Sequence, residues 1–338
     1  MRPNRTGLQQ FQHMVRALIK AGRTVVAATV LLVAAAASGA EYLLPTNGDN
    51  VIGSNTTELA AHEDTLFDVA RRNGVGYEEI LAANPGVDPW LPGEGTEILI
   101  PSRFIIPAAP REGVVVNLPE HRMYYFPPAK NGAPRVVRTY PISTAKMDWN
   151  TPMGVTKIVT KEKRPNWYPP ESVRKEHEER GDPLPKVVPP GPDNPLGEYK
   201  MRLGIPGGAY LIHGTNKPAG VGMQVTHGCI RMYPEDVEEL FGLVSINTKV
   251  NLIDQTTKVG WQRGTLYVER HAPLEGTDNP GHSDPAEMTD LINTAVSGHN
   301  VAVDWAGAER AFQQATGVPV PLSRPIARRA SVVEQRPR

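Results

Sequence analysis

Between residues 58 and 102, apolar residues recur at the spacing of an α-helix. In "EDTLFDVARRNG", Leu66, Val69 and Ala70 fall on one face behind Asp64, a candidate N-cap. The stretch "YEEILAANPG" repeats this pattern and ends at an Asn-Pro step, and the strand-like "TEILIP" follows. With "ELAA" as a first strand, the segment predicts a compact strand–helix–helix–strand unit.

From residue 103 to about residue 275, the period of the pattern changes to two. "GVVVNLPEHRMYYF" predicts two strands around a Pro-Glu turn, and "KVGWQRGTLYVERH" predicts another hairpin around an Arg-Gly turn. The stretch between them is rich in proline and predicts irregular structure, apart from a short helix over Glu171–Glu179. Long irregular segments inside a compact domain are commonly lids or binding loops. We therefore expect a mainly β domain over residues 103–275.

Both ends of the chain differ from this middle part. Residues 1–40 combine a basic start, the uncharged run "TVVAATVLLVAAAA" and the small residues "SGA", which predicts a signal peptide and a mature chain that starts near Glu41. The run is shorter than the roughly 20 apolar residues of a membrane span, and an uncleaved N-terminal anchor is the alternative. Residues 41–57 are polar and predict a flexible lead-in. Residues 276–338 predict an extension with a helix at Ala308–Thr316 and a disordered basic end.

The expected export makes the cysteine content informative. Cys229 is the only cysteine among 338 residues, so no disulfide can form within the chain. A lone thiol in an exported protein is either exposed to oxidation or retained for its reactivity. The 36 basic and 36 acidic residues cancel, which gives no electrostatic reason to expect nucleic acid as a partner. We expect a protein of the periplasm or cell wall that touches the membrane only through an uncleaved signal.

The residues around Cys229 can supply nucleophilic chemistry. Upstream, the strand-like "GAYLIHGTN" contains His213, and the Gly- and Pro-containing stretch that follows can return the chain beside it. A free cysteine has a pKa of about 8.5, and a neighbouring imidazole both takes its proton and stabilises the thiolate as an ion pair. A turn through His227 and Gly228 can aim successive backbone N–H groups at one point as an oxyanion hole. The helical pattern of "YPEDVEELFGLV" then anchors this loop to the core.

These residues resemble the signature of the L,D-transpeptidase family, which has a YkuD-type catalytic domain. The likeness rests on "IHGTN" and "THGCIRM" and extends over residues 112–275, including "TPMG" and "PPGPDNPLG". It implies that Cys229 is the nucleophile and His213 the general base, with the carbonyl of Gly214 orienting the imidazole. It also implies an oxyanion hole made by the backbone N–H groups of three consecutive residues, His227, Gly228 and Cys229.

The resemblance further implies a reaction and its partners. Enzymes of this family cut the tetrapeptide stem of peptidoglycan after its diamino acid, expel the terminal D-alanine and pass the acyl group to an amine. The amine belongs to another stem, which gives a 3→3 cross-link, or to the C-terminal lysine of a wall-anchored lipoprotein. Candidates for substrate binding are Thr226, which replaces the commoner serine, Thr215 and Arg231. Arg231 can alternatively brace the loop by a salt bridge, and no cofactor is expected.

Residues 58–102 resemble a LysM module through the segments "DTL", "ANPG" and "ILIP". LysM modules bind the N-acetylglucosamine backbone of cell-wall glycans, so the resemblance implies glycan strands as a further partner. The alternative is a spacer that only positions the enzyme. The fold implied for the whole chain is mainly β, with an L,D-transpeptidase-like β-sandwich preceded by a small α+β LysM module.

Other interpretations use the same residues. His227 is an alternative base, but adjacent side chains of an extended segment point to opposite faces, which places it badly for Cys229. The polar neighbours His227 and Arg231 disfavour a buried structural cysteine. A Cys/His hydrolase would give the acyl group to water, and a non-catalytic wall-binding protein would need no thiol in a Gly-flanked turn. The remaining histidines are scattered without ligand spacing, so no metal site is expected.

Overall fold

A computed structural model describes residues 39–129, 132–146, 151–207, 210–276, 282 and 284–325. The expected signal peptide, apart from Gly39 and Ala40, and the basic end beyond residue 325 lie outside these residues. Within the described part of the chain, no helix is long and apolar enough to cross a membrane.

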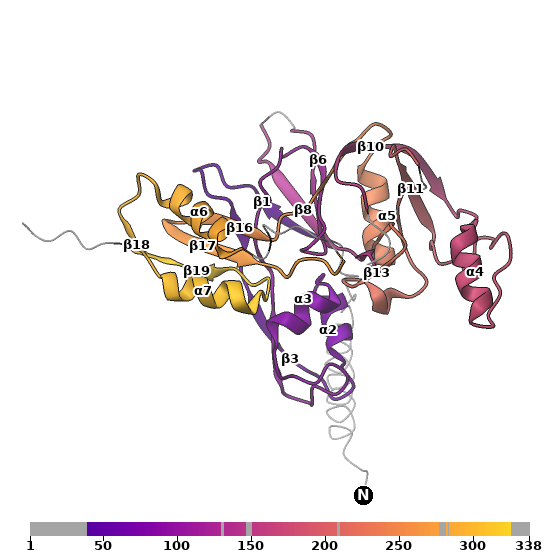
Figure 1. The fold of residues 1–338 in the computed structure, drawn as a ribbon, viewed down its shortest axis with the longest axis horizontal. Helices are drawn as coiled ribbons and strands as arrows, with labels where there is room; N and C mark the ends of the chain where they lie inside the picture. The colour runs from indigo at the N-terminus through magenta and orange to yellow at the C-terminus, as the bar shows by residue number, and fades with distance from the viewer. Residues whose placement is uncertain are drawn as a thin grey trace, which may run out of the picture. The chain divides into compact units, whose positions relative to one another are not determined.

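Strands of the middle part, together with one strand from the start of the described chain, form a nine-stranded mixed sheet (Figure 1). Its order is β1 (Ala40–Leu43), β8 (Val136–Pro141), β7 (Arg122–Phe126), β6 (Gly113–Asn117), β15 (Lys249–Ile253), β10 (Gly154–Lys163), β11 (Tyr199–Leu203), β12 (Leu211–His213) and β14 (Ile230–Arg231). The pairs β6–β15 and β12–β14 are parallel, and the other neighbours are antiparallel. The short strands β9 (Thr144–Ala145) and β13 (Gln224–Thr226) pair separately. The prediction of a mainly β domain is confirmed, but one large sheet replaces the expected sandwich of two facing sheets.

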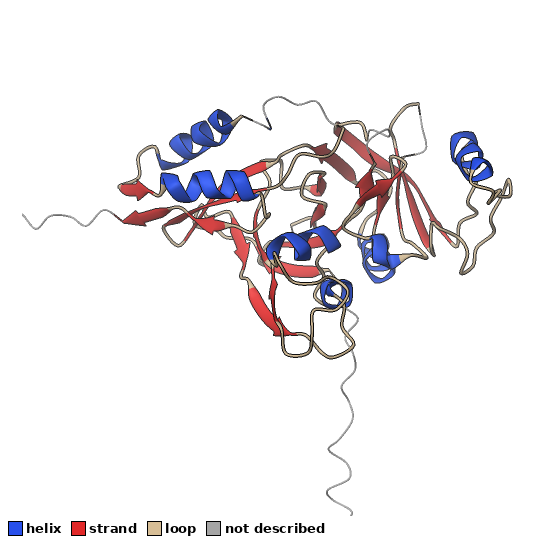
Figure 2. Cartoon of the chain, turned by 60° about the horizontal axis from the view of Figure 1, so that its bottom comes forward, coloured by secondary structure: helices blue, strands red, loops and turns tan. Residues whose placement is uncertain are grey.

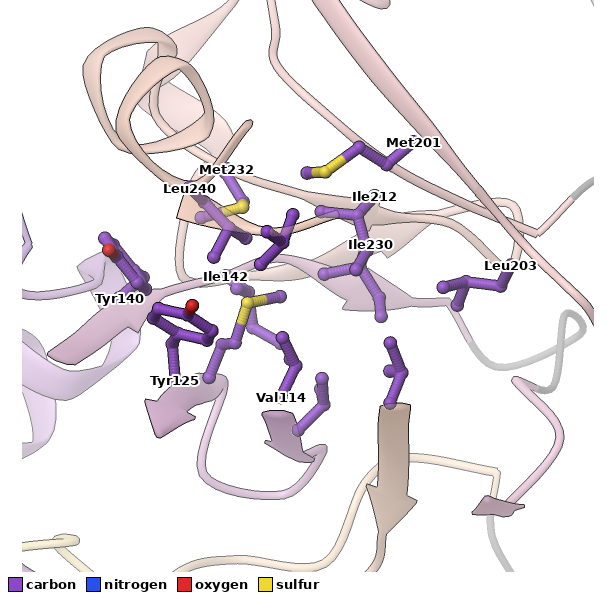
Figure 3. Packing of buried hydrophobic residues seen from close by; sticks show 14 of the residues in the cluster. Val114, Tyr125, Tyr140, Ile142, Met201, Leu203, Ile212, Ile230, Met232 and Leu240 are labelled. Carbon is purple, nitrogen blue, oxygen red and sulfur yellow. The ribbon is translucent and has the colours of Figure 1, made fainter. Parts of the chain in front are cut away.

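This sheet curls around a single hydrophobic core. Val114 from one half of the strand order and Met201 and Ile230 from the other half are buried in the same cluster, which a flat sheet could not achieve. Figure 3 shows these side chains gathered with Leu240 of helix α5 (Pro234–Leu243). The helix begins as predicted, with proline in its first turn and acidic side chains near its positively polarised end.

Ahead of this sheet, the predicted strand–helix–helix–strand unit is present. Strand β3 (Thr56–Leu59) pairs antiparallel with β4 (Glu97–Ile100), and helices α2 (Leu66–Arg72) and α3 (Tyr77–Ala83) connect them. The unit has a small core of its own, which buries apolar side chains from both helices and from β4. We call residues 56–100 the N-terminal module.

The start of α2 differs from the prediction by one residue. Thr65 caps the helix, because its hydroxyl accepts the N–H of Asp68 while the Asp68 carboxylate accepts the N–H of Thr65. Asp64, the predicted N-cap, instead binds the guanidinium of Arg72 at 2.6 Å and accepts the N–H of Ala61 at 2.7 Å. Both residue types cap helices, and the reciprocal pair with Asp68 decides between them.

A buried ion pair attaches the N-terminal module to the sheet. Arg122 of β7 is completely buried and donates from Nε and Nη2 to Glu79 of α3, both at 2.8 Å. Its Nη1 donates to the Thr139 hydroxyl at 3.0 Å, and the guanidinium lies 4.2 Å from the centre of the Phe104 ring. A charge enclosed in this way is tolerated only when it is paired. The sheet therefore depends on the module for the counter-ion of Arg122.

The expected flexible lead-in over residues 41–57 is paired with other strands instead. β1 runs antiparallel to β8, and Glu41 binds Arg138 at 2.6 Å. β2 (Val51–Gly53) runs antiparallel to β5 (Arg103–Ile105). An edge strand is held largely by backbone hydrogen bonds to one neighbour, which the polar composition of this segment did not reveal.

At the other end, the predicted boundary at residue 275 cuts through a folded unit. The predicted hairpin is present as β16 (Thr257–Gln262) and β17 (Thr265–Arg270), but helices α6 (Pro285–Val296) and α7 (Trp305–Gln314) pack on it (Figure 2). The remaining strands of this unit are β18 (Val301–Val303), β19 (Val320–Pro321) and β20 (Ser323–Pro325). The helix predicted at Ala308–Thr316 is observed as α7. Hairpin and extension share one core, since the helices cover the apolar side chains of the hairpin.

Replacement of Arg122 tests the dependence of the sheet on the module. Arg122→Met should lower the free energy of unfolding by about 3 kcal/mol, because the largely enclosed Glu79 carboxylate loses its only cation among the described residues. Arg72→Met removes a partly exposed cation of the same module and should cost at most about 1 kcal/mol. Urea unfolding curves of both variants measure the difference, and equal losses would contradict the role given to Arg122.

Candidate active site

Three neighbouring strands, β11, β12 and β14, form the floor of a pocket. Successive side chains of a strand point to opposite faces, and Met201, Ile212 and Ile230 face the core. The residues on either side of these three line a cavity of about 900 Å³, namely Lys200, Arg202, Leu211, His213, Cys229 and Arg231. The alternation therefore presents the predicted catalytic residues on one face.

The register between β12 and β14 sets the positions of His213 and Cys229. The strands are parallel, with Ile212 opposite Ile230 and His213 opposite Arg231. Cys229 lies two residues before Arg231 on the same face, and the backbone N–H of Leu211 hydrogen-bonds its sulfur. The two residues of the proposed pair thus lie on adjacent strands, one step apart along the same face.

The His213 imidazole is buried and neutral. Its Nδ1 lies 2.6 Å from the carbonyl oxygen of Gly214. A carbonyl oxygen only accepts hydrogen bonds, so Nδ1 carries the proton and Nε2 presents a lone pair. Burial, and then the positive charge of Arg231, lower the pKa of His213 to about 3. His213 is therefore an unprotonated base at neutral pH.

The surroundings of the Cys229 sulfur favour its protonated form. Burial raises the pKa of the thiol, and the Leu211 N–H and the Arg231 charge oppose this effect only in part. Together with the low pKa of His213, this shift favours a neutral thiol beside a neutral imidazole in the resting pair. The expected thiolate–imidazolium ion pair stays a prediction, and burial of the imidazole is the main factor that opposes it.

Two threonine hydroxyls hold the turn that carries the thiol. Thr226 donates to the carbonyl oxygen of Cys229 at 2.6 Å, and Thr151 donates to that of Gly228 at 3.3 Å. Gly228 has φ of +96°, a region that favours glycine. These contacts fix the peptide groups expected to form the oxyanion hole. Thr226, predicted to bind substrate, lines the pocket but uses its hydroxyl to close this turn.

His227 also lines the pocket, but its ring is bound by helix α4 (Glu171–Glu179), which has the predicted bounds. Its Nε2 lies 3.0 Å from Glu176 Oε2, and a carboxylate accepts, so Nε2 carries a proton. Glu176 also binds Lys146 at 3.1 Å and Arg180. The hydrogen bonds from His227 and Lys146 lower the pKa of Glu176 to about 2. This arrangement favours His213 over His227 as the base.

Glu176 itself was not found from the sequence. It lies 51 positions before His227, and the helical pattern around it only predicted a short surface helix. No local spacing reveals a contact that depends on how a long irregular segment folds back on the sheet. The proline-rich composition of that segment was the sole signal that it lies at a binding site.

Two other predicted substrate-binding residues lie in different settings. Thr215 is buried, and its hydroxyl accepts the N–H of Lys217 at 2.9 Å, so it shapes the loop after His213 and stays outside the pocket lining. Arg231 does line the pocket. Among the described residues it has no salt bridge, and its buried Nε has no hydrogen-bond partner. Its charge acts instead on the pKa values of Cys229 and His213.

One group of side chains away from this pocket could hold a metal ion by distance alone. Ligand atoms of Glu120, Glu269 and His271 lie within 4.8 Å of one another. The Lys258 Nζ already lies 2.8 Å from Glu120 and 2.6 Å from Glu269, and all three of these ion-pair groups are buried. The ammonium lies between the carboxylates in the place a metal ion would take, so the group joins the β6–β7 turn to the C-terminal hairpin as a buried ion cluster.

Sequence comparison places the chain among known proteins. The YkuD family model, the L,D-transpeptidase catalytic domain, matches residues 111–252. The probable L,D-transpeptidase YcfS of Escherichia coli K12 is 37% identical over 308 residues, which cover 89% of this chain and 93% of that protein. The probable L,D-transpeptidase ErfK/SrfK of the same bacterium is 37% identical over 289 residues, which cover 83% of this chain and 90% of that protein.

Solved structures give more distant matches. The catalytic domain of an E. faecium L,D-transpeptidase is 24% identical with a TM-score of 0.32, over 44% of this chain and all (100%) of that chain. L,D-transpeptidase 3 from Mycobacterium tuberculosis is 17% identical with a TM-score of 0.30, over 64% and 99% of the two chains. The sequence relatives, which align over nearly their whole length, carry the assignment: the chain is an enzyme that belongs to the L,D-transpeptidase family.

Proposed function

We propose that the protein is a peptidoglycan L,D-transpeptidase in which Cys229 attacks the diamino-acid carbonyl of a tetrapeptide stem and His213 moves the proton. The observation that carries this proposal is the β12–β14 register, which aligns both side chains on the pocket face. A nucleophile beside a base that a third group orients is the arrangement of covalent acyl transfer. Here the carbonyl of Gly214 is the third group.

In the acylation step, the Cys229 sulfur forms a bond to the carbonyl carbon while its proton moves to Nε2 of His213. The carbonyl oxygen becomes an oxyanion, which the backbone N–H groups of His227, Gly228 and Cys229 stabilise. The carbon–nitrogen bond then breaks, and the imidazolium returns the proton to the leaving amine of D-alanine. The resting neutral pair suits this sequence, because the charges form only when the substrate is in place.

In the second step, an acceptor amine attacks the thioester, His213 takes one of its protons, and the sulfur leaves and recovers a proton from the imidazolium. The acceptor is the amine of a second stem or the C-terminal lysine of a wall-anchored lipoprotein. Both lie outside the cytoplasm, in agreement with the signal peptide that the sequence predicts.

Substitutions in the pair test the proposed chemistry. A carbapenem, as a mimic of the acyl donor, should add its mass once to the wild-type protein and not to Cys229→Ser, because one imidazole ionises an alcohol poorly. His213→Ala should lower transfer by at least about 100-fold, whereas His62→Ala, at an exposed histidine of the N-terminal module, should transfer at the wild-type rate.

Mass analysis of muropeptides after incubation with each protein gives the readout. New cross-links or attached lipoprotein peptide identify the acceptor, and trimmed stems alone would replace transfer by hydrolysis. An adduct and cross-linking by Cys229→Ser would contradict the proposal.

We further propose that the N-terminal module is a LysM module that binds glycan strands. Its strand–helix–helix–strand order and separate core support this, together with Trp90 and Leu91, which are 67% and 78% exposed in the loop before β4. Exposed apolar groups side by side on a small folded unit are typical of an interaction site. Deletion of residues 58–102 would not test glycan binding alone, because it would also remove Glu79, the counter-ion of Arg122 in the sheet.

A point substitution separates binding from catalysis. Trp90→Ala should weaken retention on purified sacculi several-fold and leave transfer between soluble peptides unchanged, since Trp90 lies outside the pocket lining. Trp305→Ala, at an exposed tryptophan of helix α7, is the matched control and should be retained like the wild-type protein. Sedimentation with sacculi measures retention, and equal retention of all three proteins would make the module a spacer.

A further inference from the structure

We infer that Arg202 selects an acyl donor whose diamino acid ends in a free carboxylate. This inference rests on the proposed function, because it concerns the substrate of the same pocket. Two observations carry it, namely the position of Arg202 relative to Cys229 and the lack of an acidic partner for its guanidinium among the described residues.

The strand registers arrange the pocket floor in two rows of side chains. One row is Lys200, His213 and Arg231, and the other is Arg202, Leu211 and Cys229. Neighbouring strands lie about 4.8 Å apart, so the backbone positions of Arg202 and Cys229 are separated by about 10 Å. The reacting carbonyl must lie at the Cys229 sulfur, and Arg202 therefore meets a part of the donor that extends away from it.

Of the anionic groups that such a donor carries, the end of the diamino-acid side chain fits this distance best. The carboxylate of the leaving D-alanine lies within one residue of the reacting carbonyl, about 3.8 Å along the chain. That group is too close to the sulfur to reach the far end of the row. The long diamino-acid side chain and the long Arg202 side chain together span the separation.

A comparison of Arg202 with Lys200 shows why Arg202 is the recognition residue. Both point into the pocket from β11. Lys200 faces Glu162 across the β10–β11 pairing, and its Nζ lies 2.8 Å from that carboxylate. Arg202 faces the uncharged Thr160 in the same pairing and is exposed. The protein thus neutralises one cation of the strand and leaves the other for a ligand.

The rest of the pocket favours an anionic side chain as well. None of the described residues that line it is acidic, and Arg231 adds a second cation near the sulfur. A donor side chain that ends only in an amine would meet like charge. A carboxylate can accept two parallel hydrogen bonds from the planar guanidinium, and a carboxamide has no charge to offer. Diamino acids of the diaminopimelate type have such a carboxylate, and lysine does not.

The test compares two synthetic tetrapeptide donors that differ only at the end of the diamino-acid side chain, a free carboxylate against a carboxamide. The wild-type protein should prefer the carboxylate in kcat/KM by at least about tenfold, the scale of one charged hydrogen bond. Arg202→Ala should remove this preference by raising KM for the carboxylate donor alone, and Arg202→Lys should recover part of it. Arg164→Ala removes an exposed cation outside the pocket lining and should keep the wild-type preference.

Two outcomes would overturn the inference while the proposed function stands: an unchanged preference in Arg202→Ala, or an equal loss on both donors. If the wild-type protein transfers neither donor, the proposed function fails. The inference is then tested by comparing how tightly the protein binds the two donor peptides. Calorimetry with the inactive Cys229→Ala protein measures the affinities for the two peptides. The same measurement is then made on the protein that carries both Cys229→Ala and Arg202→Ala. If this double variant still prefers the carboxylate peptide as strongly, the role of Arg202 is overturned.

Discussion

The parallel register of β12 and β14 is the constraint on which the site depends. Ile212 and Ile230 face each other and are buried in the main core, so their burial holds the two strands in this alignment. A slip of one residue would turn the apolar pair into the pocket and would turn His213 and Cys229 into the core, so the burial of the apolar pair would be lost. The core therefore positions His213 and Cys229 although it contains neither, and helix α5 contributes by closing that core behind the turn.

The same enclosure that fixes the register also sets the charge state of the pair. The buried imidazole, with its Nδ1 proton on the Gly214 carbonyl, and the partly buried thiol beside it both have pKa values shifted toward the neutral form. Thiolates, not thiols, are oxidised readily, so a neutral pair would protect the single cysteine from oxidation until a substrate is bound. Two further charges lie around the pocket: the Glu176 carboxylate is bound to His227, and the guanidinium of Arg202 has no acidic partner among the described residues.

The sequence pattern predicted those structural features that depend on residues close together in the chain. The bounds of α4, the start of α5, both hairpins and the strand–helix–helix–strand order follow from periodicity and turn residues, and the two motifs around His213 and Cys229 identified the family. The failures involve partners that are distant in sequence. β1 is ordered by pairing with β8, the C-terminal hairpin by helices beyond residue 275, and His227 by Glu176. The charge state of the thiol and imidazole depends on the whole fold for a related reason, since the motif does not show that the His213 ring is buried.

The neutral, oriented imidazole is the central claim, and the nitrogen NMR spectrum of the resting enzyme tests it most directly. With labelled histidine, assigned by comparison with His213→Ala, both ring nitrogens of His213 should show the neutral form protonated at Nδ1 throughout about pH 5 to 8. Protonation should appear only on approach to the pKa of about 3 that burial and Arg231 impose. An imidazolium signal at neutral pH, lost when Cys229→Ala removes the thiol, would contradict the account by revealing a resting thiolate–imidazolium pair.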